Sequence, residues 1–351
     1  MNDFQRYLIH EFVEDYKDGY LSRRDLIRRV LHITGGVAST ASILVALGCG
    51  PGSAEEVATE VSTLVPTSPG ASPTGGASPT AAASPGASPE ASPAASPGAT
   101  PSGTPIGRSP LSVPEDDPSV QAEDVSFPSG DATVMAYQAR PSDASGPLPL
   151  ILICHENRGL VEHIRDVTRR FAKEGYLACA PDLLSREGGT ANISDPSQIP
   201  GILSNTDPAI YVADFQAAID YFAQQPDLAD TTRVGMTGYC FGGGITWRAA
   251  TQIADLSAAV PFYGPPPPLD QVPNIQAAVL GVYSSDPNDF ANNGRDELEQ
   301  ALQAAGVTYE IKVYPDTQHA FHNDTGPRWN PEQAEAAWND TLAWFEQYVR
   351  G

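Results

Sequence analysis

Residues 238–242 read GYCFG and place a cysteine in the pattern Gly-x-nucleophile-x-Gly. The pattern lies between an expected strand and an expected helix, so Cys240 would sit on a sharp strand-to-helix turn. Flanking glycines let the two elements approach closely, and a helix N-terminus beside the sulfur favours the thiolate. We therefore predict a nucleophilic thiol at Cys240, with the backbone N–H of Phe241 as a donor to an oxyanion. A small buried cysteine in a glycine-rich turn is the alternative.

The order of the reactive residues along the chain supports the nucleophile. Asp286 and Asp289 follow one expected strand and His319 follows the last one, which gives the order nucleophile, acid, histidine. A neutral imidazole in this place can accept the thiol proton and later return a proton to the leaving group. His322 is a weaker candidate for the base. The spacing of the histidines fits no zinc site, so no metal is expected.

These side chains need a fold that brings them together, and the pattern of elements predicts one. Two strands are expected within 123–141 around a Ser-Gly-Asp turn, and apolar strands then alternate with helices. Apolar strands flanked by helices indicate an α/β fold, with a mostly parallel sheet covered on both faces and ligands bound beyond the carboxyl ends of the strands. The further expected elements are strands 149–156, 176–182, 233–238, 257–264, 277–285 and 308–315 and helices 162–176, 207–226, 295–306 and 331–349.

The globular part resembles the dienelactone hydrolases, also called carboxymethylenebutenolidases, of the α/β-hydrolase fold. The similar segments are HENRG, APDLLSR, GYCFGGG, FYG and YPDTQHAFHND, within about residues 123–350. The cysteine is the most specific of them, because most α/β-hydrolases use serine. The resemblance implies a Cys–His–Asp triad that hydrolyses cyclic enol esters, or related lactones and esters, without a cofactor. Counting from the flanking elements leaves the acid open between Asp286 and Asp289 and slightly favours Asp289.

The resemblance also implies roles for residues around the nucleophile. Glu156 matches a glutamate beside the resting thiol, and the backbone N–H of Asn157 matches a second oxyanion donor. Arg186 matches one of two arginines that bind the carboxylate of the family's substrate. Asn323 stands where the second arginine is expected, which suggests a less anionic ester or lactone. Tyr263 either lines the pocket or packs beside it.

The front of the chain is expected to direct export. Arg23 and Arg24 precede an uncharged, moderately apolar stretch and resemble the twin-arginine export motif, so residues 1–50 are predicted to be a lead and a signal read by the twin-arginine machinery. A basic amphipathic helix on a membrane surface is the alternative. Cys49 in ALGCG resembles a lipidated cysteine; lipidation, plain cleavage and an uncleaved anchor remain open. The sequence thus predicts an extracytoplasmic protein with or without a membrane tether.

Composition separates this lead from the enzyme-like part. Residues 66–105 are almost entirely Pro, Ser, Ala, Gly and Thr, so 51–119 is expected to be a disordered linker and 120–351 the globular domain. The formal net charge of −23 argues against binding to nucleic acid.

The sequence therefore predicts a cysteine-dependent hydrolase of a small-molecule ester or lactone. Two alternatives stay open: a general esterase or thioesterase, and a non-catalytic envelope-binding module on the same fold.

Overall fold

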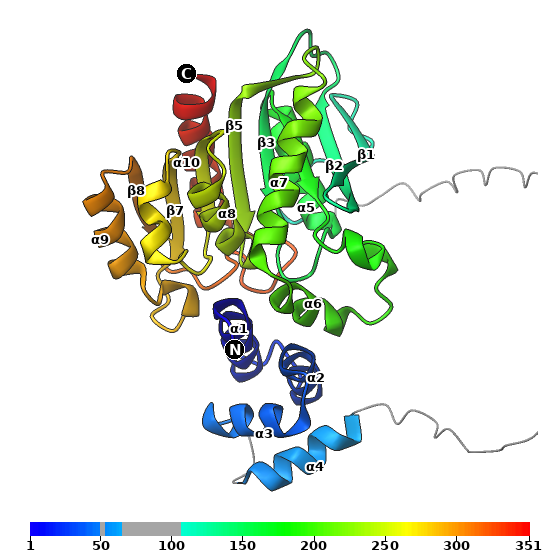
Figure 1. The fold of residues 1–351 in the computed structure, drawn as a ribbon, viewed down its shortest axis with the longest axis vertical. Coiled ribbons are helices and arrows are strands. Elements are labelled where there is room, and N and C mark those ends of the chain that lie inside the picture. The colour runs from blue at the N-terminus through cyan, green and yellow to red at the C-terminus, as the bar shows by residue number, and fades with distance from the viewer. Residues whose placement is uncertain (50–52, 65–106) are drawn as a thin grey trace, which may run out of the picture.

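A computed structural model of the chain describes residues 1–49, 53–64 and 107–351 (Figure 1). An 8-stranded sheet has the order β1-β2-β4-β3-β5-β6-β7-β8. β1 and β2 form an antiparallel hairpin, β2 pairs antiparallel with β4, and the other neighbours are parallel. The predicted α/β fold with a mostly parallel sheet is thus confirmed. The strands are β1 (Val120–Ser129), β2 (Ala132–Pro141), β3 (Leu148–Cys154), β4 (Leu177–Pro181), β5 (Ala229–Tyr239), β6 (Leu256–Phe262), β7 (Ala278–Ser284) and β8 (Tyr309–Tyr314).

Helices cover both faces of the sheet. Helices α7 and α8 contact each other and lie in front of the sheet in Figure 1, whereas α10 lies behind it. Phe171 of α5 packs on Trp338 and Phe345 of α10, which places α5 on the same side as α10. The central strands are therefore enclosed, as their unbroken apolar sequences require. The helices of this part are α5 (Glu162–Lys173), α6 (Ile199–Asn205), α7 (Pro208–Ala223), α8 (Phe241–Gln252), α9 (Arg295–Ala305) and α10 (Pro331–Phe345).

The first 49 residues fold as three helices, whereas the sequence predicted a helix here only as the alternative to an export signal. They are α1 (Asp3–Lys17), α2 (Arg23–Thr34) and α3 (Val37–Ala46). A reciprocal capping box between Asn2 and Gln5 starts α1. Its apolar residues recur at helical spacing and are buried, as are those of α2. Figure 1 shows these helices below the sheet, where both α1 and α2 contact the α/β part.

Parts of the predicted linker also have defined structure. Residues 54–64 form helix α4 (Ala54–Leu64), which packs on α3 and buries Val57 and Val61, one helical turn apart. Residues 107–119 lie against the α/β part, where the backbone N–H of Val113 donates to Asp166 at 2.6 Å. A disordered linker over all of 51–119 is therefore wrong at these two ends. The remainder of the predicted linker, residues 65–106, lies outside the described residues.

None of the helices in the described ranges is both long and apolar enough to cross a membrane. Arg23, the first arginine of the predicted export motif, pairs with Glu60 at 2.7 Å and also donates to the backbone oxygen of Cys49. The Cys49 side chain is buried in this arrangement. Export and lipidation stay predictions.

Candidate active site

Cys240 lies on a strained turn between strand and helix. β5 ends at Tyr239, α8 begins at Phe241, and Cys240 between them has φ 58° and ψ −118°, a left-handed backbone that is rare outside glycine. A Cβ atom at Gly242 would lie 2.4 Å from the carbonyl oxygen of Cys154, so only glycine lets α8 start this close to β3. The predicted strand–turn–helix around Cys240 is present. As the first residue of α8, Phe241 has a backbone N–H without an intrahelical partner.

His319 and Asp289 lie next to this turn. Nδ1 of His319 is 3.1 Å from Oδ1 of Asp289, and both side chains are buried. The Ser284 hydroxyl, at the end of β7, donates to Oδ2 of Asp289 at 2.5 Å. Asp286, the other candidate acid, instead accepts from the backbone N–H of Asn288 at 2.9 Å within the turn. The structure thus brings Asp289, and not Asp286, to His319.

The charges of this group are set by burial and by proximity. Burial by itself lowers the pKa of His319, but the charge and hydrogen bond of Asp289 outweigh it and hold that pKa well above its usual value. Burial likewise raises the pKa of Asp289, and the charge of His319 more than reverses the shift, so the pKa ends below its usual value. Burial, with a smaller contribution from the charge of Glu11, raises the pKa of Cys240 to about 12. In this arrangement the sulfur is therefore a thiol.

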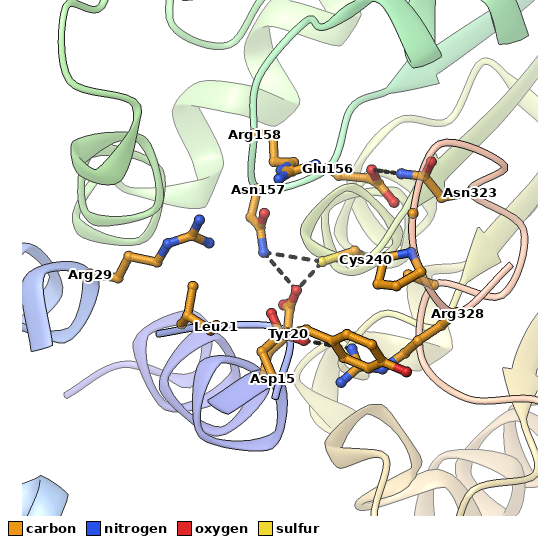
Figure 2. Close-up of a pocket in the computed structure, with 14 residues that line it drawn as sticks. Asp15, Tyr20, Leu21, Arg29, Glu156, Asn157, Arg158, Cys240, Asn323 and Arg328 are labelled. Atoms are coloured by element: carbon orange, nitrogen blue, oxygen red, sulfur yellow. Dashed lines mark hydrogen bonds and ion pairs between the residues drawn. The ribbon is translucent and has the colours of Figure 1, made fainter. Parts of the chain in front are cut away.

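Glu156 and Asn157 follow β3 and lie beside the sulfur. The side-chain Nδ2 of Asn157 is 3.7 Å from Sγ of Cys240. Glu156 accepts a hydrogen bond from Nδ2 of Asn323 at 2.6 Å, with both residues buried. Asn323, at the place of the second expected arginine, therefore binds a carboxylate of the protein itself. Figure 2 shows both contacts.

Arg186 lies elsewhere, which corrects the predicted substrate contact. Its guanidinium makes a bidentate pair with the buried carboxylate of Asp214 on α7, at 2.7 and 2.9 Å. Arg186 is not among the described residues that line the cavity at Cys240. Nη1 and Nη2 of Arg186 both donate to Asp214. This pairing supplies the partner that a buried carboxylate requires.

Tyr263 packs beside the base. Its ring is buried and meets the ring of His319 edge-on, with 5.0 Å between the centroids. Its backbone has φ 35°, and its N–H donates to Val282 of β7 at 2.7 Å. Of the two roles left open for Tyr263, the structure thus shows the packing one. His322, the weaker candidate base, stacks on Tyr239 at 5.0 Å, and burial, helped by the charge of Arg170, lowers its pKa well below the usual value.

A cavity of about 150 Å³ adjoins Cys240, and the N-terminal helices supply part of its wall. Arg328 in this wall is paired with Asp15 of α1 at 2.6 Å. Arg29 of α2 and Arg158 lie on the opposite side, as Figure 2 shows. Sequence reasoning assigned none of these residues to the site, because their contribution depends on how the N-terminal helices dock. The lining residues are Glu11, Asp15, Tyr20, Leu21, Arg29, Glu156, Asn157, Arg158, Cys240, Ala320, Asn323, Gly326, Pro327 and Arg328.

Two side chains of α1 reach the reactive atoms directly. Oε2 of Glu11 is 3.2 Å from Sγ of Cys240, and the hydroxyl of Tyr7 is 3.1 Å from Nε2 of His319. The ligand atoms of Glu11, Cys240 and His319 lie within 4.8 Å of one another and could together hold a metal ion such as zinc. In the structure these atoms instead form hydrogen bonds to protein groups.

Similarity to known proteins identifies the family of the chain. The pattern of the dienelactone hydrolase family matches residues 134–349. A candidate carboxymethylenebutenolidase of Escherichia coli is 37% identical over 254 residues, covering 68% of this chain and 93% of that protein. One of Methylorubrum extorquens is 37% identical over 238 residues, covering 65% and 81%.

Solved structures agree with these relatives. A candidate dienelactone hydrolase of Klebsiella pneumoniae superposes with a TM-score of 0.61 at 38% identity, covering 65% of this chain and 99% of that one. A dienelactone hydrolase-like promiscuous phosphotriesterase from metagenomic libraries has a TM-score of 0.59 at 23% identity and supports the fold. The sheet order and the turn at Cys240 define an α/β-hydrolase. Within that class, the chain belongs to the dienelactone hydrolase family, and the comparisons indicate a hydrolase.

Proposed function

We propose that this chain hydrolyses a carboxylic ester or lactone, with Cys240 as the nucleophile, His319 as the base and Asp289 as the residue that orients the base. The observation that carries the proposal is the convergence of these three side chains: Nδ1 of His319 is 3.1 Å from Asp289, and its ring lies within reach of the Cys240 sulfur. A carboxylate that accepts from Nδ1 turns the opposite nitrogen, Nε2, toward the nucleophile.

The proposed reaction has two halves. In the first, Nε2 of His319 takes the thiol proton, Sγ attacks the carbonyl carbon, and the tetrahedral intermediate collapses to a thioester while His319 protonates the departing alkoxide. In the second, His319 removes a proton from water, the resulting hydroxide attacks the thioester, and the carboxylic acid leaves with the thiol restored. In a lactone the departing alkoxide stays attached to the acyl group.

Backbone donors support the oxyanion in both halves. The N–H of Phe241 points from the first turn of α8, where the helix dipole adds positive potential. The backbone N–H of Asn157 is the proposed second donor, and its side-chain amide already faces the sulfur. Glu156 lies near the sulfur, hydrogen-bonded to Asn323, where it can influence the thiol proton.

A panel of chromogenic esters, thioesters and lactones tests the proposal on the wild type, Cys240→Ala and Cys240→Ser. We expect turnover of at least one ester or lactone, its loss in Cys240→Ala, and a mass increase of one acyl group on Cys240 in the wild type during turnover. Preference for thioesters or simple esters over lactones would favour the general esterase. Turnover that survives in Cys240→Ala would exclude the cysteine mechanism.

A further inference from the structure

Helix α1 covers the site and packs closely on the segment that carries Cys240. Phe4 is buried, and its ring packs on Phe241 with 4.8 Å between centroids. A Cβ atom at Gly244, the last glycine of the GYCFGGG segment, would lie 2.6 Å from the Phe4 ring. The absence of a side chain at Gly244 therefore leaves room for the Phe4 ring. The segment that positions the nucleophile thus also accommodates α1.

Glu11 occupies the space that a reacting carbonyl group needs. One carboxyl oxygen lies 3.2 Å from Sγ of Cys240, and the other accepts from Nδ2 of Asn157 at 2.8 Å. The product of ester hydrolysis is itself a carboxylic acid, released at this sulfur. The Glu11 carboxyl group thus has the chemistry and the position of a bound product.

Tyr7 fixes the protonation of the base. Its hydroxyl has one proton, and the backbone oxygen of Tyr263, 3.0 Å away, can only accept it. A hydroxyl that donates to Tyr263 accepts from Nε2 of His319, at 3.1 Å. Nδ1 of the same ring faces the Asp289 carboxylate, which also only accepts. An imidazole that donates from both nitrogens is a cation and cannot take the thiol proton.

We propose that α1 is an internal inhibitor: Glu11 takes the place of the carboxylic acid product at Cys240, Tyr7 keeps His319 protonated, and the chain turns over substrate only when α1 leaves the site. This inference rests on the proposed function, because it assigns the sulfur and the imidazole to catalysis. It gives residues 1–20, which precede the arginine pair, a role of their own.

Ion pairs at the outer end of α1 join it to the α/β part. Arg328 bridges Asp15 at 2.6 Å and Asp18 at 3.0 Å, and the Asp18 side chain is 40% exposed. The side chains of Arg328 and Asp15 are 8% and 21% exposed, so of the two ion pairs the one with Asp18 is the more exposed and the one that salt weakens more. A binding event on the N-terminal helices that opposes these contacts would shift α1 toward the undocked state.

The test uses the full-length chain with Glu11→Ala, Tyr7→Phe and the double variant Asp15→Asn/Asp18→Asn. The matched control is Arg6→Gln, on the exposed side of α1, where Arg6 pairs with Asp3. Two quantities are measured: kcat/KM on a chromogenic ester, and the rate at which iodoacetamide alkylates Cys240, followed by peptide mass. The double variant changes Asp15 in the cavity wall but leaves the groups at the reactive atoms, Cys240, His319, Tyr7 and Glu11, unchanged.

We expect both quantities to rise about tenfold in Glu11→Ala and in the double variant, which corresponds to about 1.4 kcal/mol lost from docking. Tyr7→Phe should raise kcat/KM, because the ring still packs but no longer holds the proton, and Arg6→Gln should change neither quantity. If Glu11→Ala and the double variant lose activity, or keep both rates of the wild type, α1 is not an inhibitor. Alkylation that rises without turnover in any variant counts against the hydrolysis itself, while the occlusion of Cys240 stands.

Discussion

At the scale of single residues, the site depends on which carboxylate meets the imidazole. Asp289 is held from two sides, by the Ser284 hydroxyl at 2.5 Å and by the backbone N–H of Ala291 at 3.0 Å, so its remaining lone pairs face His319. The carboxylate of Asp286 instead accepts a hydrogen bond from Asn288 within its own turn. The difference lies in tertiary contacts, and for that reason counting residues from the strand or from the helix could not decide between them.

Asp289→Asn should lower kcat/KM on the order of a thousandfold, because an amide can donate to Nδ1 and would hold the imidazole in the wrong tautomer. Asp286→Asn should leave kcat/KM within about twofold of the wild type, since surface turn residues contribute little. Steady-state kinetics on one chromogenic ester measures both. Equal losses in the two variants would contradict the assignment of the acid.

Arg186→Gln separates a structural role from a substrate contact. Removing the guanidinium leaves the buried carboxylate of Asp214 with only the Ser129 hydroxyl, which donates to it at 2.6 Å. We expect a loss of about 2 kcal/mol in the free energy of unfolding with KM unchanged. Urea denaturation and substrate kinetics give the two numbers. A raised KM with unaltered stability would restore Arg186 to the substrate site.

At the scale of elements, the turn between β5 and α8 demands small residues on three sides. A Cβ atom at Gly238 would lie 2.3 Å from the backbone oxygen of Gly242, and one at Gly243 would lie 2.2 Å from that of Phe262. The contacting atoms are backbone and cannot move aside. The glycines around Cys240 therefore fix the distance between α8 and the sheet, and with it the position of the sulfur.

Gly242→Ala should destabilise the protein by about 2 kcal/mol, because the added methyl group would overlap the carbonyl oxygens of Cys154 and His155. Gly326→Ala is the matched control: its nearest neighbour, the backbone oxygen of Asn323, would be 3.3 Å from the new carbon. The denaturation midpoints of the two variants make the comparison. A control that loses as much as Gly242→Ala would refute the overlap as the cause.

The element scale also explains what sequence could and could not predict. The strands of the α/β part and its helices other than α6 follow from local periodicity, and the turn at Cys240 follows from its glycines. The positions of α1 and α2 do not, although Phe4, Leu8 and Phe12 recur at helical spacing and are buried. Apolar spacing predicts a helix with a buried face but does not predict what that face packs against. The positions of Tyr7 and Glu11 at the site could therefore not be predicted from the sequence.

At the scale of the whole molecule, α1 brings carboxylates into a face that is already acidic. Glu14 is half-buried, and burial, followed by the charge of Asp289, raises its pKa to about 8. The charged or titratable groups around it are His10, Lys17 and Asp18 on α1 and Asp286, Asp289, His319 and Arg328 of the α/β part. We therefore expect the docking of α1 to depend on pH through Glu14.

The sign of this coupling follows from where the proton is held. An exposed glutamate has a pKa of 4.5, whereas the pKa of Glu14 in the docked helix is about 8. Between these two pH values, docking therefore retains a proton that Glu14 in the free helix would release. Docking is then strongest below about pH 4.5, weakens as the pH rises from 4.5 to 8, and stays weaker above pH 8. Glutamine at this position has no proton to lose and removes this dependence.

The ratio of the Cys240 alkylation rates of the wild type and Glu14→Gln should therefore be near unity at low pH and rise severalfold above pH 8, since the ratio cancels the intrinsic ionisation of the thiol. Glu332→Gln, an exposed glutamate at the start of α10, is the matched control and should give a flat ratio. The rates are measured by peptide mass from acid to alkaline pH. A Glu14→Gln ratio that is flat or falls with pH would show that Glu14 does not couple docking to the proton concentration.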